Sequence, residues 1–210
     1  GDLAHLIRDD DPDLDFFLNI THVQLHRRSR ALQRLRTQLT AESDTSTEAR
    51  FNQHSLSKVL LPLAMHPVYE SHTKLEEGFA LEAIATVGAI SRLLPWSKYN
   101  SILWTTLTQF DRHPTQERYL IGLICALIDG FHFEVSIPTD EDNTTDNAGS
   151  NSVWRALEKR LIPKVESLLV KEKSDRGGSK VKILRPPVIM ALLKLFKKLP
   201  EHIFVSRLPR

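Results

Sequence analysis

The sequence has 210 residues, of which 41% are hydrophobic, and its 28 Lys and Arg nearly balance its 26 Asp and Glu. Its single Cys excludes an internal disulfide framework, and no apolar run reaches the 18 residues that a membrane-spanning helix needs. The net charge of +2 does not indicate nucleic acid, but residues 153–210 are strongly basic and residues 9–15 acidic, so the chain is polarised.

Residues 1–40 predict two helices, a short one over 14–20 and a longer basic one over 22–39. In the longer segment, four leucines fall on one side at the helical step of about 100° per residue. They are Leu25, Leu32, Leu35 and Leu39.

Three arginines of the basic segment, Arg27, Arg30 and Arg34, fall together on another side of the predicted helix. This arginine row can contact a phosphate backbone or an acidic protein, or can simply face solvent. Arg28 falls among the leucines instead. A buried guanidinium needs a partner, so we expect an ion pair with Asp13 or Asp15.

The rest of the chain predicts helix pairs separated by polar stretches. A loop over 41–54 precedes two pairs over 55–133, and a disordered insertion over 134–152 precedes a third pair over 153–210. The first pair comprises helices at 56–66, ended by Pro67, and 74–94, and the second comprises helices at 97–110 and 114–131. The third comprises helices at 153–170 and 187–199, with a flexible basic insertion near 171–182 and a further helix opening at Glu201.

An internal repeat supports this division. Residues 56–62 and 157–163 share the pattern Leu-x-Lys-x-Leu-aliphatic-Pro, each opens a pair, and each pair ends on Leu-Pro, at Pro95 and Pro200. Units of about 40 residues are typical of HEAT-type repeats. We therefore predict an all-α fold, a HEAT-like α-solenoid segment of stacked antiparallel helix pairs with disordered insertions; a non-repetitive helical bundle is the alternative.

The sequence contains no recognisable catalytic pattern. His22 and His26 lie four residues apart and can offer two metal ligands, but no third ligand is near. The pair Gly177-Gly178 lacks the pattern of a phosphate-binding loop, and no serine elbow is present. We expect no enzyme activity, no cofactor and no metal.

Two basic stretches are candidate RNA or partner-binding sites. The first is the arginine row, and the second is the basic insertion with Lys171, Lys173, Arg176, Lys180, Lys182 and Arg185. No aromatic residue is interleaved with either, so RNA binding should be directed to the backbone and tolerant of sequence. Trp96 and Trp104 are expected at a seam between repeats.

Several stretches together resemble one known family. They are Asp13, Asp15-Phe16-Phe17, Asn19-Ile20, His22, Gln24-Leu25-His26-Arg27-Arg28 and Arg30-Ala31-Leu32, followed by Leu61-Pro62, Ala64-Met65 with Pro67, Ala89-Ile90 through Trp96-Ser97 with Tyr99, and Ala126 through Phe131-His132-Phe133. The chain resembles the down-regulated-in-metastasis family, the very large HEAT-repeat proteins associated with the U-three small nucleolar RNA.

The resemblance implies a non-enzymatic scaffold of the small-subunit processome in the nucleolus, acting in pre-ribosomal RNA processing and small-subunit biogenesis. Its implied partners are pre-ribosomal RNA, a small nucleolar ribonucleoprotein and ribosome assembly factors, with no membrane. It also implies that this chain is a fragment of a much longer one. A HEAT-type adaptor that binds acidic peptides or cargo proteins in transport is the alternative from another functional class.

Overall fold

A computed structural model describes residues 2–44, 51–71, 73–135, 148–174 and 180–201. The helices and strands are α1 (Phe16–Ile20), α2 (Leu25–Asp44), α3 (Gln53–Ser55), α4 (Leu61–Glu70), α5 (Glu77–Ser91), α6 (Trp96–Gln109), α7 (Glu117–Asp129), α8 (Ala148–Ala156), α9 (Ile162–Leu168), β1 (Val170–Ser174), β2 (Lys180–Leu184) and α10 (Pro186–Phe196). Short 3-10 turns lie at Ala4–Leu6, Lys74–Glu76, Phe110–Arg112 and Pro114–Gln116. None of the described helices combines the length and the apolar character needed to cross a lipid bilayer.

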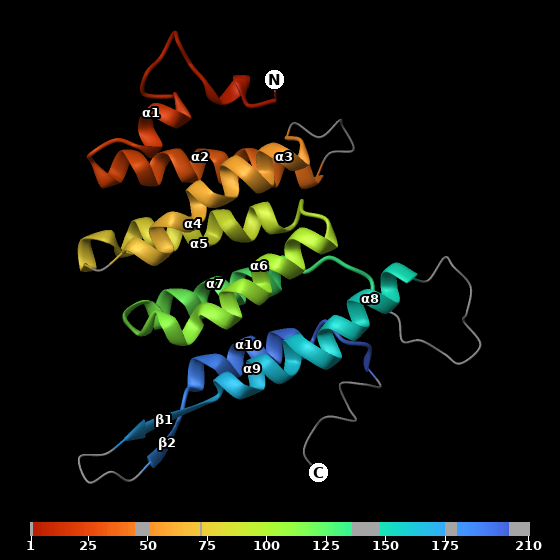
Figure 1. Cartoon of the computed structure of the whole chain (residues 1–210). Helices are drawn as coiled ribbons and strands as arrows, with labels where there is room; N and C mark the ends of the chain where they lie inside the picture. Colours follow the sequence, from red (N-terminus) through yellow and green to blue (C-terminus); the bar gives the residue numbers. More distant parts are fainter. Residues whose placement is uncertain (1, 45–50, 72, 136–147, 175–179, 202–210) are drawn as a thin grey trace.

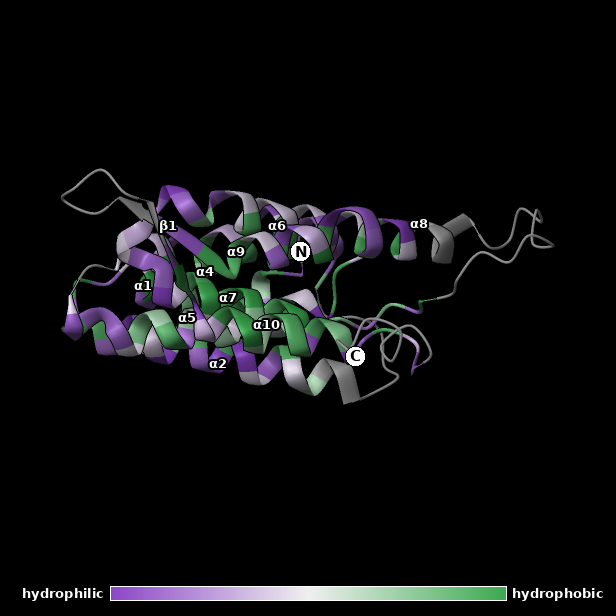
Figure 2. Cartoon of the chain, turned by 90° about the horizontal axis from the view of Figure 1, so that it is seen from below, coloured by the Kyte–Doolittle hydropathy of each residue, from purple (hydrophilic) through white to green (hydrophobic). Residues whose placement is uncertain are grey.

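The helices are stacked in tiers (Figure 1). Helix α2 packs on α5, α5 on α7, and α7 on α10, which forms one continuous layer. Helices α4, α6 and α9 pack on α5, α7 and α10 respectively and form the second layer, and Figure 2 shows apolar residues gathered between the two layers. One connected hydrophobic core runs through all tiers. The predicted all-α solenoid segment of stacked helix pairs is confirmed.

The internal repeat corresponds to a shared backbone feature. Leu56–Leu60 and Leu157–Leu161 are π-helical, and the backbone N–H groups of Leu61 and Ile162 donate to the carbonyls of Leu56 and Leu157, five residues back. A proline follows at the second position of α4 and of α9. Proline has no N–H and its ring clashes with the carbonyl four residues earlier, and a widened turn makes room for it.

The predicted end of a helix at Pro67 is wrong, because α4 continues through it to Glu70. Pro67 and Val68 are both buried, and Ser71 donates from its hydroxyl (2.6 Å) and its backbone N–H (3.1 Å) to the Pro67 carbonyl. Burial of these apolar groups offsets the hydrogen bond that Pro67 cannot make.

Helices α5 and α7 approach each other closely at small residues. A Cβ atom added to Gly88 would lie 3.3 Å from both the Cβ atom and the carbonyl oxygen of Ala126. In the same tier, the buried Tyr99 hydroxyl of α6 donates to the Leu127 carbonyl at 2.6 Å. Burial, and next the negative charge of Asp129, raise the pKa of that hydroxyl.

Several predicted boundaries differ from the structure. Helix α2 extends into the loop expected over 41–54, and α8 begins at Ala148, inside the insertion expected over 134–152. The described parts of the basic insertion near 171–182, which was expected to be flexible, lie in β1 and β2, an antiparallel ribbon in which Lys171 pairs with Ile183 and Glu172 with Lys182. Residues 136–147 of the expected insertion, and residues 202–210 of the helix expected from Glu201 onwards, lie outside the described residues.

Leucine substitutions at two glycines of α5 test the close packing against α7. Gly88→Leu should lower the free energy of unfolding by about 1–3 kcal/mol, because the new side chain meets Ala126. Gly78→Leu is the control, since an added Cβ there has nothing within 4 Å, and should leave stability unchanged or raise it by up to about 1 kcal/mol. Urea unfolding followed by circular dichroism measures both, and equal destabilisation would contradict close packing at Gly88.

Candidate nucleic-acid interface

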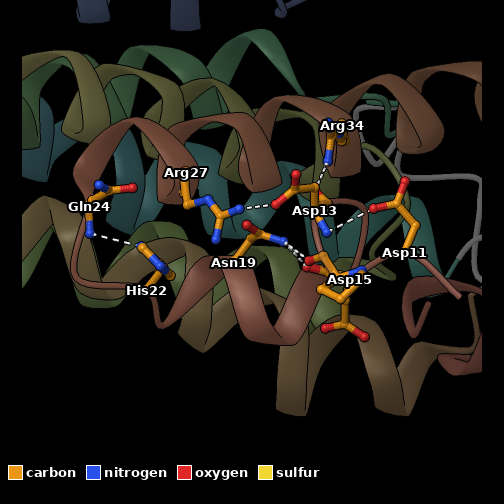
Figure 3. Close-up of polar contacts among 9 residues, drawn as sticks. Asp11, Asp13, Asp15, Asn19, His22, Gln24, Arg27 and Arg34 are labelled. Carbon is orange, nitrogen blue, oxygen red and sulfur yellow. Dashed lines mark hydrogen bonds and ion pairs between the residues drawn. The ribbon is translucent and has the colours of Figure 1, made fainter. Parts of the chain in front are cut away.

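The acidic N-terminal segment lies across the arginine row (Figure 3). The Arg27 guanidinium forms an ion pair with the Asp13 carboxylate, and the Arg34 guanidinium donates to the Asp13 backbone carbonyl. The Asp11 carboxylate in turn accepts from the Asp13 N–H at 3.0 Å. Two of the three arginines in the row therefore bind the chain's own N-terminal segment.

A local hydrogen-bond network fixes the shape of that segment. The Asp15 carboxylate caps α1 by accepting from the Leu18 N–H at 2.7 Å, and also accepts from the Arg8 N–H at 3.0 Å. The Asn19 amide donates to the Pro12 carbonyl (2.8 Å) and the Asp15 carbonyl (2.6 Å). Backbone donation, first from Leu18, lowers the pKa of the Asp15 carboxyl despite the opposing effect of burial.

Arg28 does not form the ion pair that we expected with Asp13 or Asp15. Its guanidinium lies over the Phe79 ring of α5, 4.4 Å from the ring centre, and its Nε donates to the Ile20 carbonyl at 3.1 Å. A ring face and a carbonyl at the end of α1 thus take the place of a carboxylate. Sequence alone indicated that Arg28 faced the core but not which chemical group it would meet there.

The remaining arginines of α2 divide between structure and solvent. The Arg36 guanidinium pairs with the Glu82 carboxylate of α5 at 2.7 Å and holds the two helices together. Arg30 is exposed and has no hydrogen bond or ion pair within the described part of the chain. A phosphate can therefore meet Arg30 directly, and reaches Arg27 or Arg34 by replacing Asp13.

The second candidate surface is the ribbon of β1 and β2. Lys182 is exposed, whereas Lys171 is close to Glu117 of α7, 3.3 Å from nitrogen to oxygen. Lys173 and Lys180 belong to the two strands, and Arg176 lies outside the described residues. The ribbon projects from the end of the third helix pair (Figure 1), which makes it a basic arm on the solenoid.

Arg185, the last residue of the predicted set, is buried with only 7% of its surface exposed. Its guanidinium lies 3.2 Å from an Asp111 carboxylate oxygen and 3.3 Å from one of Glu117, and donates to the Leu168 carbonyl at 3.1 Å. The guanidinium also covers the Phe110 ring. The fold therefore uses Arg185 as an anchor between the second and third helix pairs, and its guanidinium is buried away from any phosphate at the surface.

Placement and burial decide whether the other titratable groups that the structure describes can bind a metal or act as nucleophiles. Within the described residues, no group of three or more His, Cys, Asp or Glu side chains is placed to hold a metal ion. The Cys125 thiol is half-buried, and burial raises its pKa. A raised thiol pKa lowers the thiolate fraction at neutral pH, so this thiol is a poor nucleophile.

Comparison with known proteins gives a consistent result. No family model matches the chain. It is 28% identical over 126 residues, 60% of its length, to U3 small nucleolar RNA-associated protein 20 of Saccharomyces cerevisiae. It is 26% identical over 128 residues, 61% of its length, to the protein of that name in Schizosaccharomyces pombe. The chain resembles U3 small nucleolar RNA-associated protein 20. It spans about 5% of the length of each of these curated relatives.

An Asp13→Asn substitution tests whether the acidic segment competes with phosphate for the arginine row. Losing the Asp13 charge weakens its ion pair with Arg27, so the affinity for a single-stranded oligoribonucleotide should rise by about 2- to 5-fold. This factor corresponds to the free energy that an exposed ion pair contributes. Asp10→Asn removes the same charge from an exposed side chain and should raise affinity less. Fluorescence anisotropy measures both, and identical affinities would show that Asp13 does not mask the row.

An Arg185→Met substitution tests the anchor role of this residue. Losing the hydrogen bond to Leu168 and the two ion pairs should lower the free energy of unfolding by about 2–4 kcal/mol. Lys182→Met, at an exposed position of β2, should change it by less than about 0.5 kcal/mol. Thermal and urea unfolding measure both variants, and an unchanged Arg185→Met midpoint would refute the anchor.

Proposed function

We propose that this chain is a non-enzymatic structural segment of a scaffold in the small-subunit processome, acting in pre-ribosomal RNA processing and small-subunit biogenesis. The observation that carries the proposal is the similarity, over about 60% of the chain, to two fungal proteins named as associated with the U3 small nucleolar RNA. The stacked helix pairs support it, because an extended solenoid provides surface for holding partners rather than a closed site for turnover.

The mechanism is geometric. Each pair buries its apolar face against its neighbours through one connected core, so the position of one tier constrains the position of the next. Partners bound to successive tiers are therefore held at fixed separations. Pre-ribosomal RNA and assembly factors are the proposed partners, and the nucleolus is the proposed location.

The RNA contacts of this proposal come from two places. On α2, Arg30 can bind a phosphate directly. Arg27 and Arg34 bind one after the phosphate replaces Asp13 as their partner. On the ribbon, Lys182 is exposed, and Lys171, Lys173 and Lys180 belong to the same two strands; Arg176, outside the described residues, stays a candidate from the sequence alone. Cations of this kind contact phosphates without reading bases, so the contacts position RNA rather than select a sequence.

Crosslinking in cells tests the function directly. RNA crosslinked to the protein that contains this chain should be enriched in pre-ribosomal RNA and U3 small nucleolar RNA. Replacing Arg27, Arg30 and Arg34 by Ala should reduce crosslinks from α2 several-fold while helical content stays unchanged, because the core side of α2 is retained. Replacing Lys58, Lys74 and Lys98, three exposed lysines, by Ala is the charge-matched control.

Two results would contradict the proposal. Crosslinks confined to cargo or trafficking proteins would favour a transport adaptor instead. Loss of helical content in the triple Arg variant, without a corresponding loss in the Lys control, would show that the arginine row serves folding rather than binding.

A further inference from the structure

A furrow of about 450 Å³ lies between α6 on one side and α8 with the π-helical segment that follows it on the other. We call it the seam furrow, because it lies where the second and third helix pairs meet. It belongs to neither of the two basic surfaces described above. Its polar and aromatic lining comes from two helix pairs, and the lining residues of one pair lie more than 50 positions from those of the other in the sequence. The lining side chains are Trp96 and Asn100 of the second pair, and Ser152, Arg155, Lys159 and Arg160 of the third.

One wall of this seam furrow is strongly basic. Arg155, Lys159 and Arg160 line it, and no carboxylate does. Arg155 is exposed and has no hydrogen bond or ion pair within the described residues, while Lys159 lies 3.4 Å from its neighbour Glu158 on an exposed edge. An exposed pair of this kind contributes little stability, so both cations are available to an anionic ligand.

The π-helical turn helps to place these cations. A π-helical turn is wider than an α-helical one because its hydrogen bonds join residues five apart, as the bond from the Ile162 N–H to the Leu157 carbonyl shows. Lys159 and Arg160 lie within this turn, four and five residues after Arg155. The widened turn therefore presents three cations along one wall of the furrow.

The opposite wall is aromatic and amide-bearing. The Trp96 ring packs against Tyr99 and Phe133, with ring centres 6.1 Å and 5.1 Å apart, and is therefore held in a fixed orientation. Two turns further along α6, the partly buried Trp104 lies beside the furrow rather than in its lining, and its ring centre is 4.3 Å from the Arg160 guanidinium. Asn100 between them offers both a donor and an acceptor.

We propose that the seam furrow binds single-stranded RNA, with Arg155, Lys159 and Arg160 on the phosphates and Trp96 beside the bases. Cations along one wall and a fixed indole on the other match a ligand with a charged backbone and flat, uncharged bases. An acidic peptide such as polyglutamate would use the cations but would leave the Trp96 ring without a flat group to stack on. The inference deepens the function proposed above and rests on it for the choice of RNA as partner.

A charge-reversal pair tests the furrow. Arg155→Glu combined with Lys159→Glu in the 210-residue protein should lower affinity for a 15-nucleotide oligouridine at least 10-fold. Loss of two phosphate contacts should also make the negative slope of log affinity against log salt concentration shallower by about 1.4. Lys58→Glu combined with Lys98→Glu makes the same charge change at exposed positions outside the furrow and should cost less than about 3-fold.

A second measurement separates binding from folding. Oligouridine should quench tryptophan fluorescence in the wild-type protein and in the Lys58/Lys98 control, but not in the Arg155/Lys159 variant. The melting temperatures of all three proteins should agree, because the substituted side chains are exposed. A variant that melts earlier is replaced by Arg155→Gln with Lys159→Gln, for which the same loss of quenching is expected.

Three results of the binding measurements would overturn the furrow proposal. They are equal losses of affinity in the variant and the control, no binding of oligouridine by the wild-type protein, and binding of a polyglutamate peptide in preference to oligouridine. Crosslinks to pre-ribosomal RNA from other parts of the protein, unchanged in the Arg155/Lys159 variant, would refute the furrow and leave the assembly function standing. Crosslinks to cargo proteins alone would refute both.

Discussion

The arrangement of the helices depends on α5, which lies between α2 and α7. Toward α7 it presents Gly88, where even a methyl group would press on Ala126, so the two backbones can approach closely. Toward α2 it presents Phe79 and Glu82, which receive the guanidinium groups of Arg28 and Arg36. The close contact of α5 with α7 and its polar contacts with α2 together hold the basic helix α2 against the solenoid.

Burial decides what each arginine does. Arg185 is enclosed between carboxylates and a carbonyl, and removing a partner from such a cluster is costly, so its position is part of the fold. The pair between Arg27 and Asp13 is exposed, and such pairs contribute about 0–1 kcal/mol. A phosphate can replace Asp13 at that small cost, whereas nothing outside the protein can reach Arg185.

Local features were predictable from the sequence and long-range ones were not. Helix periodicity and the repeated proline at Pro62 and Pro163 depend on neighbouring residues, so the helix pairs and their equivalence could be inferred. The partner of Arg28 lies on another helix, 51 positions along the chain, and no local pattern identifies it. The ribbon was missed because charge obscured the alternation of Lys with Val181 and Ile183, which favours a strand.

The same limit explains why the furrow between the second and third helix pairs could not be predicted from the sequence. Along the chain, Trp96 and Arg155 are separated by a polar insertion, but stacking of the second and third helix pairs places them on facing walls of one furrow. A ligand that spans both walls binds only while these two pairs are stacked, so its binding energy also stabilises the seam. In a solenoid, a composite site of the kind proposed for the furrow would link ligand binding to the packing of successive tiers, and the solenoid would become stiffer where the site is occupied.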